Sequence, residues 1–300
     1  MPNDMLEIKH LRKSFGKHDV LRDISISVPT GKIVGLLGKN GAGKTTMIKC
    51  ILGLLNYSGE IIYDGKPLDH TDIQVMNSIG ALVDTAFFDD MTAFDNMKIQ
   101  MLSTPKRDNR HMKDDIMSLL QFVGLVDNAK DKVKGFSFGM KQRLALAQTL
   151  ITNAKLLILD EPFVGLDPLG IILVKEKLIE MCKQNQTTVI FSSHQLSEVK
   201  EISGILIVIE NGGIRYSGTY DKLAQQNKQY RIILGESIKN TDFQKLTEQG
   251  VQIATTEHEQ EYVLLQGGDT LDVLLRQLYQ GDYTVREIVR EDKILESLFV

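Results

Sequence analysis

One glycine-rich stretch limits what this chain can fold into more than any other. Residues 38–46 read Gly-Lys-Asn-Gly-Ala-Gly-Lys-Thr-Thr, which fits the spacing G-x-x-x-x-G-K-[ST]. An apolar run at 33–37 precedes it and predicts a buried strand, and an apolar-periodic segment at 47–52 follows and predicts a helix. In that context the glycines allow several backbone N–H groups to point at one phosphate chain, and the helix N-terminus adds partial positive charge. We therefore expect a nucleotide-phosphate site.

Within this stretch the side chains have separate expected roles. Lys44 is expected to reach the β- and γ-phosphates, and the Thr45 hydroxyl is expected to ligate Mg²⁺. A plain glycine-rich turn with a solvated lysine is the alternative, and the flanking strand and helix argue against it. The predicted nucleotide contacts are Gly38, Asn40, Gly41, Ala42, Gly43, Lys44, Thr45 and Thr46.

The overall composition excludes several classes of protein. The chain has 300 residues and a formal net charge of -4, so a nucleic-acid binder with a broad basic surface is not expected. Cys50 and Cys182 both fall in helix-like segments and are predicted to be small core residues of a reducing compartment. The chain has no apolar run long enough to span a membrane and no signal-peptide pattern at its N-terminus. A cytoplasmic location is the expectation.

Two further predicted strands are followed by side chains that could take part in catalysis. Residues 156–159 are apolar and are followed by Asp160 and Glu161, and the apolar strand at 188–193 is followed by His194. Ligands of open parallel sheets bind outside the carboxyl ends of the strands. We expect Asp160 to hold Mg²⁺, directly or through water, and Glu161 to activate a water. The alternatives are two solvated acids at a capped strand end and a structural histidine.

The remaining elements indicate an α/β fold with an added antiparallel layer. Alternating residues at 5–15 and 20–28 and a short strand at 59–65 predict that layer. A strand at 79–83 ends at Asp84. The region from about 86 to 150 is expected to be helical, and its methionines, at helical spacing, form either core or a docking face for a partner helix.

Two weaker signals precede the second acidic strand end. Ser137 is a natural helix cap, and Gly139 would allow the backbone to approach a ligand, so a second anion-binding helix N-terminus is possible on pattern alone. Phe15 lies beside a turn, where it could stack on an adenine ring. From the residue physics alone, a core aromatic is the favoured interpretation of Phe15.

A polar run at 225–228 predicts a domain boundary. We expect one domain at 1–226 and a second at 227–300. The second contains the predicted order βαββαβ, which suggests a small ferredoxin-like α+β unit, and ends in an apolar turn at 294–299. No catalytic constellation is evident in it.

Taken together, these patterns resemble the ATP-binding subunits of ABC transporters, from residue 5 to about residue 225. The resemblance implies a P-loop NTPase (RecA-like) core with an antiparallel β layer and a helical subdomain. The motifs, in chain order, are residues 38–46 (Walker A), 137–143 (signature), 156–161 followed by Pro162 (Walker B), 165–168 (D-loop) and His194 (switch histidine).

The family likeness also assigns roles to single residues. It implies that Phe15 stacks on adenine, against the core interpretation above. It implies that Ser137 and Gly139 close on the ATP of a second subunit, with Asp167 of the D-loop beside them, in a head-to-tail homodimer or heterodimer. It implies ATP and Mg²⁺ as cofactors, with Lys44, Glu161 and His194 as the catalytic groups.

Departures from the usual family pattern point to a subgroup. Phe136, Phe138 and Met140 replace residues of the common L-S-G-G-Q signature, and Asp84 stands where the family has a glutamine. Both features, and the ending at 295–299, are similar to the bacitracin- and lantibiotic-type exporters that confer self-immunity. In the family this glutamine supplies an oxygen to Mg²⁺ and links nucleotide state to the permease. We expect Asp84 to do the same through a retained water, and the alternative is a solvated acid.

The resemblance therefore implies an ATPase that powers a separate membrane permease from its cytoplasmic face and has no nucleic-acid partner. A cassette ATPase that acts on ribosomes or nucleic acid is the main rival. Such relatives usually carry two cassettes or a long coiled coil, and this chain shows one cassette and no heptad array. A non-catalytic regulatory member is the second rival, and Glu161 and His194 argue against it.

Overall fold

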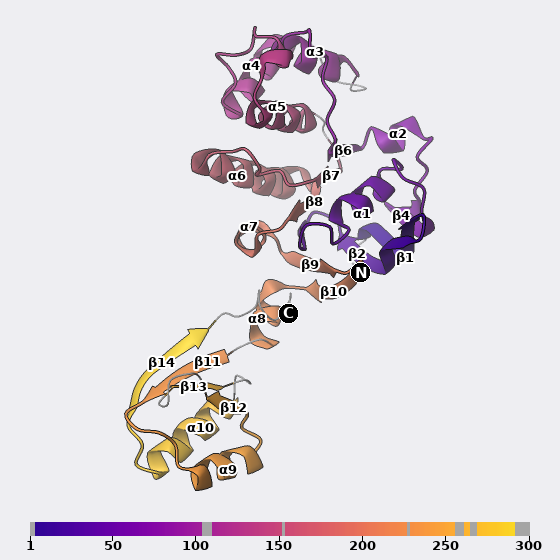
Figure 1. Cartoon of the computed structure of the whole chain (residues 1–300). Coiled ribbons are helices and arrows are strands. Elements are labelled where there is room, and N and C mark those ends of the chain that lie inside the picture. Colours follow the sequence, from indigo (N-terminus) through magenta and orange to yellow (C-terminus); the bar gives the residue numbers. More distant parts are fainter. Residues whose placement is uncertain are drawn as a thin grey trace. The chain divides into compact units, whose positions relative to one another are not determined.

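A computed structural model of the chain describes residues 4–103, 110–151, 154–226, 229–255, 261–264 and 269–291. The chain divides into two compact units, 1–217 and 218–300 (Figure 1). The division falls before the helix α8 (Tyr220–Gln226), whereas the polar run in the sequence suggested a boundary after it. The expected apolar turn at 294–299 lies outside the described residues.

The first unit is built on a six-stranded sheet. Its five consecutive strands from β9 to β6 run parallel, and β10 follows β9 across the turn Asn211–Gly212, whose two residues both have positive φ (48° and 77°). That geometry is the one preferred by two-residue hairpins. In spatial order the strands are β10 (Gly213–Gly218), β9 (Ile205–Glu210), β3 (Ile33–Leu37), β8 (Thr188–Ser193), β7 (Leu156–Leu159) and β6 (Ile79–Leu82).

The central strands of this sheet are apolar because both of their faces are covered. Every residue of β3, β7 and β8 is buried. Continuous apolar runs of this kind are typical of parallel strands that are buried on both faces. Because β3, β8 and β7 run parallel, their carboxyl ends emerge together at one edge of the sheet. The sequence places its candidate catalytic groups at this edge.

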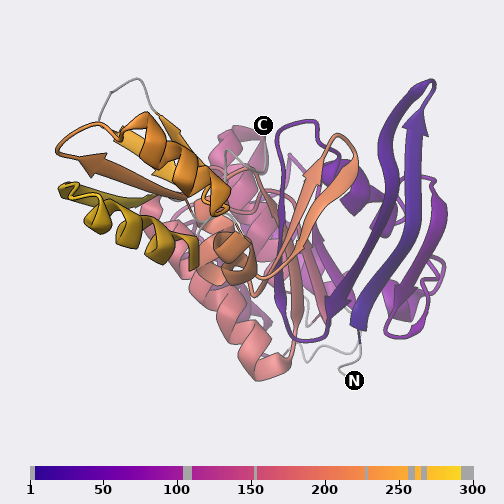
Figure 2. The same cartoon turned by 90° about the horizontal axis from the view of Figure 1, so that it is seen from below.

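A second, antiparallel sheet packs against the first through one continuous hydrophobic core. Its long β1–β2 hairpin forms a separate layer (Figure 2). The alternation of buried and exposed residues along β2 leaves one face for the core, as the sequence predicted. Its strands, in spatial order, are β2 (His18–Pro29), β1 (Asp4–Phe15), β4 (Ser58–Tyr63) and β5 (Lys66–Pro67).

The helices of the first unit include a separate group made by α3, α4 and α5, which contact one another at the top of Figure 1. This group covers the region expected to be helical. Of its methionines, Met97 and Met101 are buried in the core, whereas Met91 remains 37% exposed. The helices are α1 (Lys44–Ile51), α2 (Ile73–Met76), α3 (Ala93–Ser103), α4 (Met112–Phe122), a short 3-10 turn (Val133–Gly135), α5 (Phe138–Leu150), α6 (Pro168–Asn185) and α7 (Leu196–Ile202).

Both cysteines behave as structural residues. Cys50 is buried in α1, Cys182 is half-buried in α6, and neither forms a disulfide. Burial raises the pKa of both thiols, which lowers the thiolate fraction and with it their reactivity.

After α8, the described residues of the second unit form a four-stranded antiparallel sheet with two further helices. Its element order, βαββαβ, agrees with the order expected from the sequence. Leu246 of α9 and Leu274 and Leu278 of α10 share one hydrophobic cluster with the sheet residues Ile232 and Leu264. In spatial order the strands are β12 (Ile253–Thr255), β13 (Glu261–Leu264), β11 (Gln229–Leu234) and β14 (Val285–Glu291), and the helices are α9 (Asn240–Glu248) and α10 (Asp269–Gln280).

Candidate ATP-hydrolysis site

The loop between β3 and α1 curls around a pocket of about 190 Å³. Gly43 has φ of 110°, a conformation that other residues rarely adopt, and a Cβ atom there would lie 2.8 Å from Leu21 Cδ2. A Cβ atom on Gly38 would lie 2.6 Å from the carbonyl oxygen of Ile209. The loop thus requires glycine at both positions. The lining residues are Val20, Lys39, Asn40, Gly41, Gly43, Lys44, Thr45, Thr46 and Glu161.

Lys44 is buried, with only 6% of it exposed, and its ammonium points into this loop. The Nζ atom donates a hydrogen bond to the carbonyl oxygen of Gly38 at 2.7 Å and lies 3.6 Å from Oε1 of Glu161. The loop's own carbonyl and a carboxylate therefore hold the cation where a phosphate chain would need it.

Asp160 follows β7 and accepts two hydrogen bonds. The Thr45 hydroxyl donates to Oδ2 at 2.7 Å, and the Ser192 hydroxyl donates to Oδ1 at 2.6 Å. Ser192 also accepts a hydrogen bond from the backbone N–H of Glu161 at 2.8 Å. The structure thus brings together Thr45 and Asp160, the two residues expected to ligate Mg²⁺, and that role stays a prediction. The sequence analysis missed Ser192, although a small polar residue at the end of an otherwise apolar buried strand was a usable signal.

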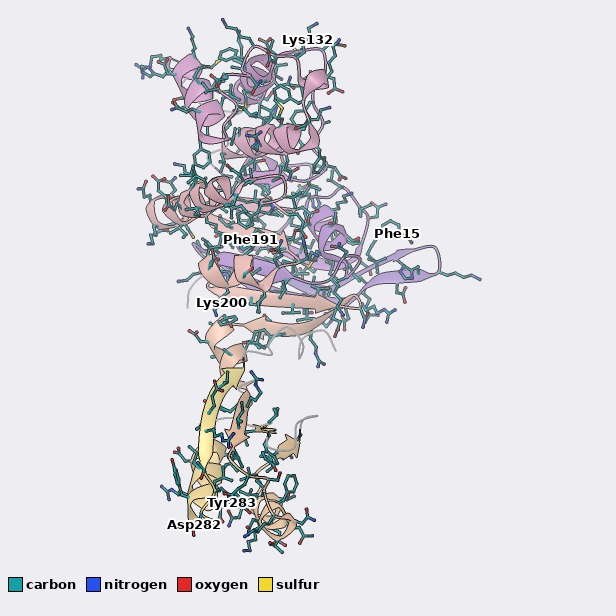
Figure 3. The ribbon with its side chains drawn as sticks, turned by 60° about the vertical axis from the view of Figure 1, so that its left-hand side comes forward. Phe15, Lys132, Phe191, Lys200, Asp282 and Tyr283 are labelled. Atoms are coloured by element: carbon teal, nitrogen blue, oxygen red, sulfur yellow. The ribbon has the colours of Figure 1, made fainter. Side chains whose placement is uncertain are left out.

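Glu161 lies at the centre of the candidate catalytic groups. Its Oε2 atom is 3.0 Å from Nδ1 of His194, while its other oxygen faces Lys44. Its backbone has φ of 48°, in the left-handed region that few non-glycine residues adopt. Two residues further on, Phe163 packs edge-to-face on Phe191 with ring centroids 5.6 Å apart, and Phe191 lies inside the first unit in Figure 3. This packing anchors the chain just after the carboxylate.

Asp84 does not join the Thr45–Asp160 pair directly. Its Oδ2 atom instead lies 2.5 Å from Nζ of Lys49 on α1, and 68% of its side chain is exposed. Asp84 and Asp160 nevertheless line one pocket of about 550 Å³ beside the phosphate loop. A metal-directed role for Asp84 stays a prediction.

The signature segment and the D-loop meet through their backbones. A Cβ atom on Gly139 would lie 3.1 Å from the carbonyl oxygen of Gly165, so a larger residue would push these two backbones slightly apart. Ser137 caps α5 by accepting from the N–H of Met140 at 3.3 Å, and Asp167 caps α6 by accepting from the N–H of Gly170 at 3.0 Å. The sequence predicted the helix cap at Ser137 but not the one at Asp167.

Phe15 is not a core residue. It ends β1 beside the hairpin turn, lies on the part of the β1–β2 hairpin that extends beyond the rest of the first unit in Figure 3, and is 50% exposed. The Nζ atom of Lys13 lies 4.9 Å from its ring centroid. The core interpretation that residue physics favoured is therefore wrong, because the strand end carries this side chain beyond the hydrophobic layer. Adenine stacking stays a prediction. Neither Phe15 nor Ser137, Gly139 or Asp167 lines the phosphate-loop pocket.

Two absences apply to the described part of the chain. Across those residues no group of three or more His, Cys, Asp and Glu side chains is arranged to hold a metal ion. Among the same residues, every helix is too short or too polar to cross a membrane.

Comparison with known proteins agrees with the fold. Residues 21–164 match the family model described as ABC transporter. The chain is 40% identical over 220 residues to the lantibiotic transport ATP-binding protein SrtF of Streptococcus pyogenes, a match that covers 72% of this chain and 92% of that protein. It is 35% identical to the bacitracin transport ATP-binding protein BcrA of Bacillus licheniformis, over 75% of this chain and 73% of that protein.

A solved structure described as the ATP-binding subunit of an ABC transporter matches with a TM-score of 0.66 and 27% identity. The match covers 73% of this chain and 91% of that one. This chain therefore belongs to the ATP-binding subunits of ABC transporters. It has their mixed α/β P-loop NTPase fold and is an ATPase.

Proposed function

We propose that this chain is the motor subunit of an exporter that removes an antimicrobial peptide, a lantibiotic or a drug, and that it drives a separate membrane permease. The observation that carries the proposal is the joining of Lys44, Glu161 and His194 into one cluster at the phosphate loop. The similarity to SrtF and BcrA, whose names give lantibiotic and bacitracin transport, supports the class of cargo.

The cluster supports in-line attack of water on the γ-phosphorus of ATP. When ATP binds, its phosphates are expected to displace the Gly38 carbonyl and the Glu161 carboxylate from the Lys44 ammonium, which then contacts the phosphates. Glu161 then accepts the water's proton, and His194 contacts the γ-phosphate. Catalysis of this kind is mostly positioning and charge stabilisation. Glu161 and His194 follow the buried strands β7 and β8, and Lys44 begins helix α1, which keeps the positions of these groups defined.

The residues present fit a magnesium ion. Thr45 and Asp160 offer a hydroxyl and a carboxylate that already meet at 2.7 Å. Mg²⁺ is usually bound by one or two protein oxygens together with substrate phosphates and water. A dedicated cluster of acids is therefore not needed here. When bound, the ion supplies neutralisation of phosphate charge. Asp84 is proposed to approach it through a retained water.

We propose further that two ATP-binding subunits act as a head-to-tail homodimer or heterodimer. In this arrangement Ser137 and Gly139 of one subunit, with Asp167 beside them, close on the ATP of the other, and Phe15 stacks on adenine. Phe15 is exposed, and Ser137 and Gly139 lie at the N-terminus of α5, which supports their availability to a partner. The complex is expected to sit on the cytoplasmic face of the membrane through its permease, with no nucleic-acid partner.

The second unit is proposed to be a ferredoxin-like accessory domain for assembly or regulation. Its strand order, with the first and third strands of the unit in the centre, supports this assignment. None of the candidate catalytic residues lies in it, so its removal is expected to spare nucleotide binding.

Co-expression with the neighbouring permease tests the proposal. A protein with about six apolar segments of some 20 residues is expected to be encoded beside this chain. The pair is expressed in a peptide-sensitive strain, and the tolerated concentrations of bacitracin and of a lantibiotic are measured against the Glu161→Gln pair as control. Increased tolerance with the wild-type pair only is expected. ATPase activity stimulated by ribosomes or nucleic acid, with no change in tolerance, would overturn the transport assignment in favour of the rival.

A further inference from the structure

Helix α1 contacts both neighbouring acidic strand ends through one face. Thr45 and Lys49 are four residues apart, so their side chains lie on the same side of the helix, one turn from each other. Thr45 donates to Asp160 at 2.7 Å, and Lys49 pairs with Asp84 at 2.5 Å. The Lys49 side chain is only 26% exposed. The Lys49 side chain, which reaches from α1 to the segment after β6, is therefore partly shielded from solvent.

The two acids are close for a reason of topology. β6 and β7 are parallel neighbours in which Leu82 is paired with Leu159, and the N–H of Asp160 donates to the carbonyl oxygen of Leu82 at 2.9 Å. Asp84 follows Leu82 by two residues, and both acids line the same pocket. A cation at either acid therefore lies at the pocket that the other acid also lines.

The segment that carries Asp84 is anchored at its far end. Asp89 pairs with Lys141 of α5 at 2.9 Å. The buried Asn96 side chain accepts from the backbone N–H of Phe88 at 2.9 Å and donates to its carbonyl oxygen at 3.1 Å. A change in the position of the Asp84 carboxylate is thus confined to residues 84–87, which belong to no helix or strand.

We propose that Lys49 is a positioning residue of the ATP site. It holds the Asp84 carboxylate beside α1 and competes for it with Mg²⁺–ATP. The inference rests on the proposed approach of Asp84 to the metal. Because the Lys49 ammonium and the ion are both cations drawn to one carboxylate, binding of the ion requires the Lys49–Asp84 pair to weaken. Lys49 therefore raises the concentration of Mg²⁺ needed for tight ATP binding.

The first test measures the affinity of a fluorescent ATP analogue while Mg²⁺ is titrated. Lys49→Met, which keeps the length of the side chain and its helix propensity, is compared with Asp84→Asn and with the double variant. Because the Asp84 carboxylate of this ion pair is largely exposed, the pair is expected to be weak, and Lys49→Met is expected to lower the half-saturating Mg²⁺ concentration about two- to fivefold. In the Asp84→Asn background the same change is expected to have no effect.

The second test does not depend on nucleotide. Hydrogen exchange of the amides at 84–87 is measured in the nucleotide-free full-length protein, where Lys49→Met is expected to accelerate it. Lys155→Met is the matched control, since it breaks the exposed Lys155–Asp64 pair of 2.9 Å at the opposite end of β7. It should alter neither the exchange nor the Mg²⁺ dependence.

The outcomes separate this inference from the proposed function. If Lys49→Met leaves the half-saturating Mg²⁺ concentration unchanged or raises it, the competition is overturned. An equal effect of Lys49→Met with and without Asp84 also overturns it, because the action would not pass through that carboxylate. Neither of these outcomes would contradict ATP binding or transport by the wild-type protein. Conversely, a failure of transport alone would not contradict the hydrogen-exchange result.

Discussion

Glu161 Oε2 and His194 Nδ1 lie 3.0 Å apart, although the two residues follow different strands and are separated by 33 positions in the chain. Strands β7 and β8 pair in parallel, so their carboxyl ends are adjacent. The other carboxylate oxygen of Glu161 is 3.6 Å from Lys44 Nζ. A single carboxylate thus connects the residue expected to bind the phosphates with the residue expected to contact the γ-phosphate.

The first prediction concerns Glu161→Gln. The carboxamide can still orient a water but cannot accept its proton, so ATP binding is expected to persist while turnover falls by about 10²- to 10⁴-fold. Phosphate release and nucleotide affinity are to be measured on the same preparation. Steady-state release within about twofold of wild type would rule out a general-base role of the size given above.

The second prediction concerns Lys44→Ala. The substitution removes the cation that the loop directs at the phosphates and leaves the Gly38 carbonyl without its hydrogen bond. Since a charge-assisted contact contributes about 1.5–3 kcal/mol, ATP affinity is expected to fall by at least about tenfold and hydrolysis to stop. Calorimetry gives the affinity, with Lys155→Ala as a control lysine outside the site. Undiminished affinity would contradict the phosphate-loop assignment.

The third prediction follows from Ser192, which the structure alone revealed. Its buried hydroxyl links the Asp160 carboxylate to the Glu161 N–H. Ser192→Ala leaves that N–H unsatisfied, so the free energy of unfolding should fall by about 1–3 kcal/mol, and kcat should fall because both acids lose their support. Urea unfolding and ATPase assays measure the two effects. Replacement by Thr, which retains the hydroxyl, should restore part of kcat, and equal losses with both variants would argue against the hydrogen-bonding role.

The fourth prediction concerns the second unit. Truncated chains of residues 1–217 and 1–226 should both bind ATP with wild-type affinity, because the phosphate-loop pocket is built from the first unit alone. Calorimetry on folded material measures this. A truncated chain that folds, as judged by circular dichroism, and yet fails to bind would show that the second unit takes part in nucleotide binding.

The fifth prediction concerns Tyr283, which lies in the second unit in Figure 3. Its hydroxyl accepts from the Lys239 N–H and donates to Asp242 Oδ2, both at 2.9 Å. Tyr283→Phe removes both bonds, and the loss of about 1 kcal/mol for each of the two should lower the Tm of this unit by roughly 8–16 °C. Calorimetric scanning of the full-length chain measures it.

The same pair predicts a pH dependence. The hydrogen bond from Tyr283 is the largest of the contacts that hold the pKa of Asp242 below its usual value of 3.8. A carboxylate whose folded-state pKa is lowered contributes stability above its unfolded pKa and loses it as the pH falls through the folded value. The difference in Tm between wild type and Tyr283→Phe should therefore shrink between pH 7 and about pH 3. A constant difference would mean that the contact with Asp242 contributes nothing.

By itself the sequence predicted most of the elements and supplied the candidate site residues. Local rules suffice for this part. The spacing of glycines, and an apolar run with the residue that follows it, are patterns within a few neighbouring positions. The phosphate loop, Asp160, Glu161 and His194 could therefore be predicted without coordinates. The element order of the second unit could be predicted on the same grounds.

Only the tertiary structure decided which of these residues meet. Ser192 became part of the site because β7 and β8 are neighbours in the sheet, and Lys49 reached Asp84 because α1 packs beside the end of β6. Residue physics alone favoured a core position for Phe15, but the structure places it at an exposed hairpin end. Which residues far apart in the sequence come into contact depends on the order of the strands in the sheet and on which side chains the core can bury. Periodicity along the chain records whether a residue faces a core, but it does not record which residue of another strand lies opposite.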